Sequence, residues 1–196
     1  VCSCIALNFT IPGEFCGKKI WFFSFSMDIV KLQIQKKRKE LLFLFSKVYS
    51  GGLRGIDGYV VQVEADVSDG LPGFYMVGSL ASEVREAEER VRTAMRNAGF
   101  HLSARKITVN LSPANVRKEG TACDLPVAIA VLAAYGIVMP SGLKQTGFLG
   151  ELGLDGKIKP VRGVLSMVLA MAEKGLERCF LPEENVAEGV AAGCME

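Results

Sequence analysis

Residues 117–135, RKEGTACDLPVAIAVLAAY, combine a short polar loop with a long apolar segment, and this pattern is the clearest indication of the fold. Every side chain after Asp124 is largely apolar, so the segment predicts a helix that is buried on all sides in the middle of a domain. Pro126 is tolerated in the first turn of such a helix, and Gly136 can end it. Asp124 stands at its start, where a carboxylate side chain is expected to cap the free backbone N–H groups.

Three short segments before this helix have the pattern of β-strands. Residues 59–67 and 107–111 alternate apolar and polar side chains with a period of two, which is typical of strands with one buried face. Residues 68–70, Ser-Asp-Gly, form a turn sequence that leads to another short strand at residues 74–77. The sequence therefore predicts a hairpin between the strands on either side of that turn.

An amphipathic helix is predicted between these strands. Its apolar face repeats at helical spacing and consists of Val84, Ala87, Val91, Ala94, Met95 and Ala98. Ser82 is expected to cap its first turn, and Gly99 is expected to end it. Glu86 and Arg90 form a pair of opposite charges, four residues apart, on the face that we expect to be solvated.

The last third of the chain continues the alternation of strands and helices. Asp155-Gly156 predicts a hairpin between two strands within residues 148–159. The next helix is expected to have an apolar face of Val164, Leu165, Val168, Leu169 and Ala172. A short strand at residues 179–181 and a helix after Pro182 follow. The predicted order, β-β-α-β-α-β-β-α-β-α, is that of a mixed α/β (α+β) domain.

The first 50 residues differ from the rest in composition. They contain 7 of the 11 Phe, the single Trp and only 2 of the 21 Gly, and their net charge is +5. Residues 51–196 contain 15 Lys and Arg against 18 Asp and Glu, a net charge of −3, which gives no overall attraction to nucleic acid. Residues 1–44 have no steady apolar period. We expect them to be an extension, disordered or derived from a misplaced start site, and residues 45–196 to be the domain.

Zinc sites, disulfide frameworks and membrane spans are not predicted. The Cys residues are Cys2, Cys4, Cys16, Cys123, Cys179 and Cys194, without CxxC spacing, and His101 is the single His. A domain that can build a core does not need disulfides, so buried and reduced thiols are expected. No apolar run approaches the ~18 residues that a membrane span needs. We therefore expect no metal, no membrane and a cytoplasmic location.

Many motifs in this sequence are shared with one protein family. They are GIDG at residues 55–58, VEADVSDGLPGF at 63–74, VRE at 84–86, ERVR at 89–92, ITVNLSPA at 107–114, KEG at 118–120, DLP at 124–126, GEL at 150–152, LDG at 154–156 and PVRGV at 160–164. In these motifs the chain resembles, from residue 45 to residue 196, the N-terminal domain of the ComM/YifB family of magnesium-chelatase (ChlI)-related AAA+ ATPases.

The resemblance implies a fold and a set of partners. The fold would be that of ribosomal protein S5 domain 2, which the proteolytic domain of Lon shares. An AAA+ ATPase module would follow residue 196 and bind ATP and Mg, with no cofactor in the present chain. ComM assemblies are hexameric helicases that promote DNA branch migration in natural transformation. The resemblance thus implies a non-catalytic domain whose partners are its own ATPase module, the other hexamer subunits and, through the full-length protein, DNA.

The sequence lacks the residues that two kinds of catalytic site, a Ser–Lys peptidase site and an ATP-binding phosphate loop, would need. Lon proteases use a Ser that a Lys activates, and the resemblance places Ala122 at the Ser position and Leu165 at the Lys position. Neither side chain has a reactive group. Residues 13–19 approach a phosphate loop but are one residue short and lack the hydroxyl that binds Mg. We therefore expect no enzyme activity in this chain, and a Lon-like peptidase is the disfavoured alternative.

The loop before the buried helix is the candidate contact site. Its polar side chains are Arg117, Lys118, Glu119 and Asp124. The first two are expected to face solvent and to contact a neighbouring subunit, the ATPase module or a DNA phosphate. A DNA-binding module is a further alternative, because Arg105 and Lys106 would extend these two side chains into one basic patch.

Overall fold

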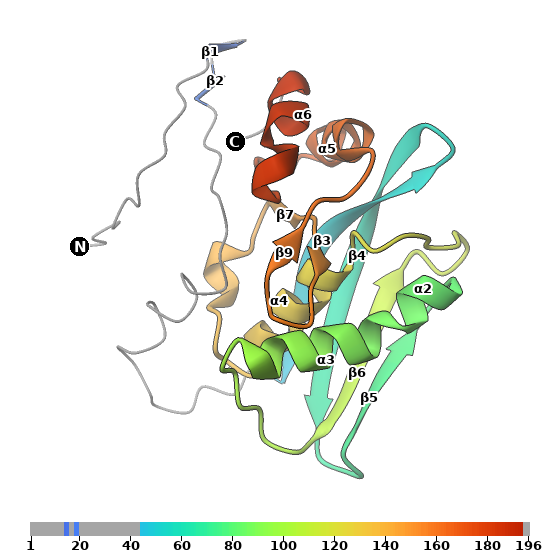
Figure 1. The fold of residues 1–196 in the computed structure, drawn as a ribbon, viewed down its shortest axis with the longest axis vertical. Helices are drawn as coiled ribbons and strands as arrows, with labels where there is room; N and C mark the ends of the chain where they lie inside the picture. Colours follow the sequence, from blue (N-terminus) through green and yellow to red (C-terminus); the bar gives the residue numbers. More distant parts are fainter. Residues whose placement is uncertain (1–13, 16–17, 20–43, 194–196) are drawn as a thin grey trace, which may run out of the picture.

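The computed structural model describes residues 14–15, 18–19 and 44–193, and a central sheet runs through the domain (Figure 1). The sheet has six strands in the order β10-β7-β3-β4-β6-β5. They are β3 (Phe45–Arg54), β4 (Asp57–Ser68), β5 (Gly73–Val77), β6 (Lys106–Ser112), β7 (Thr146–Phe148) and β10 (Arg178–Phe180). β4 is antiparallel to both β3 and β6, whereas β5, β7 and β10 lie parallel to their neighbours. The predicted mixed α/β class is confirmed.

The predicted buried helix is α4 (Asp124–Ala134), and all of its residues are buried. It packs against the middle strands β3 and β4, and α3 (Ala87–Asn97) packs against its outer side. The side chains of β4 that belong to the same core alternate along the strand: Val61, Val63, Ala65 and Val67. The period-two pattern of residues 59–67 and the uniform apolarity of α4 were therefore reliable signals.

Helix α5 (Val164–Glu173) contacts β3 and β4 through a second core, to which Val60 of β4 contributes. Because neighbouring side chains of a strand point to opposite faces, α5 lies on the face opposite to α4. Its buried residues are Val164, Met167, Val168 and Met171. The predicted apolar face was wrong in part, since Leu165 is 38% exposed and Leu169 is 42% exposed. The two Met side chains, which fit irregular space, occupy the core instead.

Strand pairing differs from the prediction at β5. The predicted hairpin between β4 and β5 is absent, because β5 pairs with β6 in parallel and β6 lies between β5 and β4. Strand β3, which forms a ten-residue antiparallel pair with β4, was not predicted from the sequence. Gly51 and Gly52 interrupt the alternation of β3, and β3 forms a long hairpin with β4 around residues 55–56.

Shorter elements complete the domain. β8 (Glu151–Leu152) and β9 (Ile158–Lys159) form the hairpin that Asp155-Gly156 predicted, and α6 (Val186–Ala191) is the predicted last helix, preceded by the turn η2 (Glu183–Asn185). A single-turn helix α2 (Ser82–Arg85) precedes α3, and another turn, η1 (Pro140–Gly142), precedes β7. The predicted cap by Ser82 was wrong, because Ser82 is the first residue of α2 and its hydroxyl donates to Glu83 instead.

The expected extension at residues 1–44 lies almost entirely outside the described residues. Of it, the structure describes Leu44 and two paired two-residue strands, β1 (Glu14–Phe15) and β2 (Lys18–Lys19). Cys2, Cys4, Cys16 and Cys194 also lie outside the described residues. Cys123 and Cys179 are buried and form no disulfide, as expected for reduced thiols. None of the helices that the structure describes is long and apolar enough to cross a membrane.

Candidate functional site

The backbone of the loop that joins β6 to α4 is hydrogen-bonded to the segment just before α2. Lys118 N–H donates to the carbonyl of Ser79 (2.8 Å), and the carbonyl of Lys118 accepts from Ala81 N–H (3.0 Å). Two residues later, Gly120 N–H donates to a carboxylate oxygen of Glu83 (3.4 Å). The predicted contact loop is therefore held in a defined conformation.

Asp124 does not cap α4, which corrects the prediction. It is the first residue of the helix, no side chain caps the helix, and its own side chain is 1% exposed. The carboxylate accepts from Arg90 Nε at 2.8 Å and from Arg90 Nη2 at 3.0 Å, and it also accepts from Leu152 N–H at 3.3 Å. Asp124 thus connects three elements, α3, α4 and β8, through one buried carboxylate.

The sequence did not predict that Arg90 binds Asp124 at this loop. The prediction placed it on the solvated face of α3 beside Glu86, and that pair is present, but at 3.9 Å and with Glu86 exposed. The signal that could have revealed its role was the carboxylate at the start of an entirely apolar helix, because a buried carboxylate needs a cation. Burial raises the pKa of Asp124, and the hydrogen bonds and positive charge of Arg90 oppose that shift. The bonds to Asp124 in turn raise the pKa of Arg90, which keeps the guanidinium charged.

Lys118 does not face solvent, which is a second correction. The residue is 2% exposed, and its ammonium group donates to the carbonyl oxygens of Pro113 and Val116. Burial lowers the pKa of this ammonium group. The side chain closes the turn of its own loop, so its role is structural and it is removed from the set of contact residues.

Arg117 and Glu119 are the exposed charges of the loop. Their side chains are 67% and 65% exposed, and Arg117 Nε lies 3.7 Å from a carboxylate oxygen of Glu119. They border a depression of about 220 Å³ between this loop and the end of the β3–β4 hairpin. At the tip of that hairpin Ile56 is 87% exposed. The loop and the tip of the hairpin thus expose one apolar and two charged side chains near this depression.

The positions that correspond to a Lon dyad lie in different surroundings. Ala122 is partly buried against the α5 core, whereas Leu165 is in the first turn of α5 and exposed. The thiol of Cys123, next to Ala122, lies 3.7 Å from the hydroxyl of Ser50. Burial raises the pKa of Cys123 to about 11, with a smaller opposing effect from the Ser50 hydrogen bond. A buried neutral thiol is a poor nucleophile.

The four predicted basic residues do not form one patch. Arg105 and Lys106 are at the start of β6, and Arg117 and Lys118 follow its end, so the length of a seven-residue strand, ~20 Å, separates the two pairs. Arg105 is paired with Asp69 at 3.0 Å, and Lys118 is buried. The geometry therefore does not support the DNA-binding alternative at this place.

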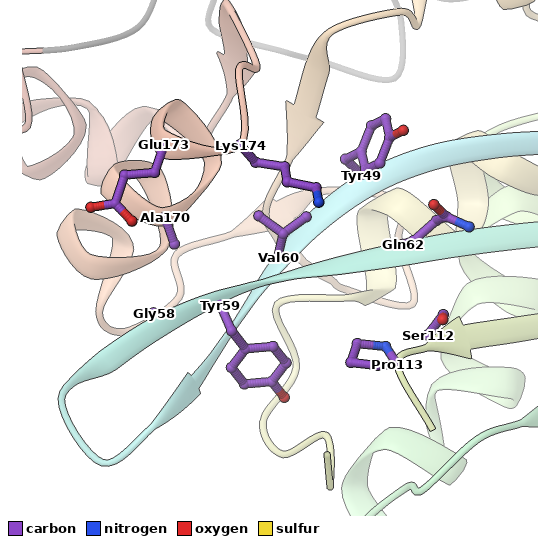
Figure 2. A pocket seen from close by; sticks show the side chains of 10 residues that line it. All are labelled: Tyr49, Gly58, Tyr59, Val60, Gln62, Ser112, Pro113, Ala170, Glu173 and Lys174. Carbon is purple, nitrogen blue, oxygen red and sulfur yellow. The ribbon is translucent and has the colours of Figure 1, made fainter. Parts of the chain in front are cut away.

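A second, larger groove lies on the other side of Tyr59. Its volume is about 540 Å³, and it runs between the C-terminal turn of α5 and the point where β6 ends, at Ser112 (Figure 2). No local sequence pattern predicts this groove, because it arises from strand pairing between distant parts of the chain. Within the residues that the structure describes, no three His, Cys, Asp or Glu side chains converge in a way that could hold a metal ion.

Comparison with known proteins gives consistent matches over the same domain. Residues 63–185 match the family described as subunit ChlI of Mg-chelatase. The competence protein ComM of Haemophilus influenzae is 43% identical over 141 residues, which cover 72% of this chain and 28% of ComM. YifB of Escherichia coli is 40% identical over 143 residues, covering 73% of this chain and 28% of YifB.

A more distant similarity extends to Lon proteases. The Lon protease of Mycolicibacterium smegmatis is 28% identical over 140 residues, covering 67% of this chain and 17% of the protease. The chain thus spans 28% of the length of the ComM and YifB proteins that it matches.

Proposed function

Because the chain belongs to the magnesium-chelatase ChlI family, together with ComM and YifB, we propose that it is the non-catalytic N-terminal domain of an AAA+ ATPase. The complete protein would be an ATP-driven DNA branch-migration helicase that acts in natural transformation and recombination. The name of the H. influenzae relative, a competence protein, supports this biological setting.

One observation carries the non-catalytic part of the proposal. The loop and the helix that a Lon-type site would need are both present, but Ala122 and Leu165 have no nucleophile and no base. Cys123, the adjacent thiol, is buried and its pKa is raised to about 11. A fold whose loop is fixed by one buried ion pair and by hydrogen bonds, but whose reactive groups are missing, favours a binding or assembly role.

ATP and Mg belong, in this proposal, to a separate module of the longer protein. The near match to a phosphate loop at residues 13–19 does not fit the nucleotide, because it is one residue short and no hydroxyl follows its Lys. Among the residues of the described domain, none forms a comparable glycine-rich loop before a helix.

The contact surface is the one that Ile56, Arg117 and Glu119 form at the end of the β3–β4 hairpin. These side chains are exposed, and the backbone of the loop is fixed by Lys118 and by its hydrogen bonds to Ser79 and Ala81. A rigid and exposed surface of mixed apolar and charged character suits an interface with the ATPase module or with a neighbouring subunit of a hexamer.

A chimera tests this assignment. In H. influenzae ComM, the matching segment is replaced by residues 45–196, and Arg117→Ala is combined with Glu119→Ala. We expect reduced hexamer formation or reduced DNA-stimulated ATP hydrolysis, with the stability of the domain changed by less than about 0.5 kcal/mol.

The matched control is Glu89→Ala with Arg92→Ala, because these residues form another exposed ion pair at 3.7 Å, on α3. The control should behave as the unmodified chimera does. If the loop variant also assembles and turns over ATP on DNA at the unmodified rate, this surface is not the interface.

A further inference from the structure

The depression beside the predicted contact loop is lined by basic side chains from two elements. It has a volume of about 220 Å³ and lies between residues 53–55, at the end of the β3–β4 hairpin, and residues 115–119 of the loop. Arg54 lines it from the hairpin and Arg117 from the loop, and both residues are exposed. The amide of Asn115 adds further N–H donors. The lining therefore offers donors to a negatively charged group.

The two guanidinium groups are not neutralised by close ion pairs. Among the ion pairs of the described residues, none includes Arg54. Arg117 Nε lies 3.7 Å from a carboxylate oxygen of Glu119, which is longer than a hydrogen bond. Glu83 also acts electrostatically on Arg117, but its carboxylate accepts from Gly120 N–H and does not line the depression. The guanidinium donors therefore remain available to a ligand.

The buried ammonium group of Lys118 adds positive charge next to the depression. Its Nζ donates to the carbonyl of Val116 at 2.9 Å, and Val116 lines the depression. Lys118 takes part in none of the ion pairs of the described chain. A buried cation without a carboxylate partner favours an anion in the space beside it. Three cations, those of Arg54, Arg117 and Lys118, thus lie at or beside a depression with one lining carboxylate, Glu119.

The walls of the depression are held in place by hydrogen bonds. The hydroxyl of Tyr59, on β4, donates to the carbonyl of Arg117 at 3.2 Å, which connects the loop to the hairpin. The backbone of Lys118 is hydrogen-bonded to Ser79 and Ala81. Because the main chain on both sides is already ordered, binding of a ligand costs little conformational entropy there.

We propose that this depression binds a carboxylate group of the partner protein that contacts this surface. The planar N–H fork of Arg matches the two oxygens of a carboxylate and binds them through charge-assisted hydrogen bonds. Ile56, which follows the lining residue Gly55, is 87% exposed, so the partner places an apolar side chain beside the acidic one. The inference rests on the proposed function and specifies its partner as an acidic segment with an adjacent apolar residue.

A nucleic acid backbone fits this depression less well than a single carboxylate. Glu119 lines the depression and repels the successive phosphates of a strand, and residues 51–196 have a net charge of −3. A single carboxylate, in contrast, only has to replace Glu119 beside Arg117. Glu119 is therefore an internal competitor, and its removal should strengthen the binding of the partner's carboxylate.

NMR titration of the 196-residue chain at constant ionic strength tests the proposal, with the Nε–Hε signals of Arg54 and Arg117 and the amide signals of residues 115–119 as the readout. The probe is the peptide acetyl-Leu-Glu-Leu-amide, and its uncharged isostere acetyl-Leu-Gln-Leu-amide is the control. We expect the acidic peptide to bind at least about five-fold more tightly than the control, and more tightly than a thymidine trinucleotide. Equal affinity of the two peptides, or tighter binding of the trinucleotide, would overturn the proposal.

Variants with opposite expected effects separate this site from a general effect of charge. Arg54→Gln and Arg117→Gln should each weaken binding of the acidic peptide by at least about three-fold, whereas Arg96→Gln, at an exposed residue of α3, should leave it unchanged. Glu119→Gln should strengthen binding by about two-fold or more, because the internal competitor is lost. Weaker binding by the Glu119 variant, or equal weakening by all three Arg variants, would contradict a carboxylate site at this place.

The ComM chimera distinguishes this inference from the proposed function. If Arg117→Ala with Glu119→Ala reduces hexamer formation but the 196-residue chain shows no preference for the acidic peptide, the carboxylate site is wrong and the proposed interface stands. If the chain prefers the acidic peptide but the chimera variant assembles normally, the carboxylate site stands and the proposed interface is wrong.

Discussion

At the scale of single residues, two buried charges fix the loop before α4. Asp124 is held by two hydrogen bonds from Arg90, and Lys118 is held by two carbonyl groups of its own loop. A buried ion pair adds little net stability over an apolar pair, but removal of one partner leaves the other charge uncompensated. The two charges therefore act mainly to specify one loop conformation.

Replacement of Arg90 by Met should be strongly destabilising. Arg90→Met leaves the buried carboxylate of Asp124 without its cation, and we expect the free energy of unfolding to fall by roughly 3–5 kcal/mol. Urea unfolding measures this change. Glu86→Ala is the control, because it removes only the exposed partner of Arg90 at 3.9 Å and should cost less than about 0.5 kcal/mol. A loss below about 1 kcal/mol for Arg90→Met would contradict the role of the pair.

Lys118 and Arg117 should behave differently although they are neighbours. Lys118→Met keeps most of the buried volume but leaves the carbonyl groups of Pro113 and Val116 without a donor, which should cost about 1–3 kcal/mol. Arg117→Ala changes an exposed side chain and should stay within about 0.5 kcal/mol. Thermal unfolding compares the two variants, and equal effects would show that Lys118 is not the buried support described above.

Because the pKa of the Cys123 thiol is raised, we expect the free energy of unfolding to fall at high pH. Its pKa is raised from 9.0 to about 11 in the folded state, so folding favours the neutral thiol. This contribution is fully present below about pH 9 and is lost as the pH rises through about 11. Between these values the wild type should lose up to about 2–3 kcal/mol more than Cys123→Ala, as measured by urea unfolding. Parallel pH profiles of the two proteins would contradict this prediction.

At the scale of elements, local patterns predicted helices and turns but not strand partners. The uniform apolarity of α4 and the Asp-Gly turn between β8 and β9 are local signals, and both predictions are confirmed. The parallel pairing of β5 with β6 depends on a connection through α3, which no local pattern specifies. β3 was missed because Gly51 and Gly52 interrupt its alternation. Gly51 leaves room for Met167 of α5, and Gly52 leaves room for the ring of Tyr59.

For the candidate site, too, the sequence predicted the local segment but not the contacts that its side chains make. The loop was proposed from its position before a buried helix and from its resemblance to Lon, and Asp124 was singled out for a helix cap that it does not form. The partners of its side chains were not found, because Arg90 is 34 residues away in the sequence and Lys118 looks like a surface residue from its type alone.

Close packing of α5 on the β3–β4 hairpin can be tested at Gly58. A Cβ atom at this position would overlap the backbone carbonyl of Ser166 in α5, and backbone cannot yield cheaply. Gly58→Ala should therefore cost about 1–3 kcal/mol. Gly142→Ala is the control, because a Cβ atom there meets nothing within 4 Å and the residue does not need a positive φ. Calorimetry should show a lowered Tm for Gly58→Ala only. A normal Tm would indicate that α5 is loosely packed.

At the scale of the whole molecule, the described domain combines a rigid core with one surface of mixed apolar and charged character. The end of the β3–β4 hairpin presents Ile56, Arg117 and Glu119, and the depression beside it is lined by Arg54 and Arg117. Residues 51–196 have a net charge of −3, which disfavours general binding to DNA. We therefore propose contacts with protein partners, and not direct contacts with nucleic acid, for this surface.

We propose that this domain couples ATP hydrolysis in the ATPase module to DNA without catalysis of its own. The most direct test compares DNA-stimulated ATP hydrolysis by the ComM chimera that contains residues 45–196 with that of the same protein lacking this segment, alongside the isolated chain. We predict strong stimulation in the chimera, a loss of stimulation of at least about five-fold on deletion, and no turnover by the isolated chain. Undiminished stimulation after deletion, or hydrolysis by the isolated chain, would contradict the account.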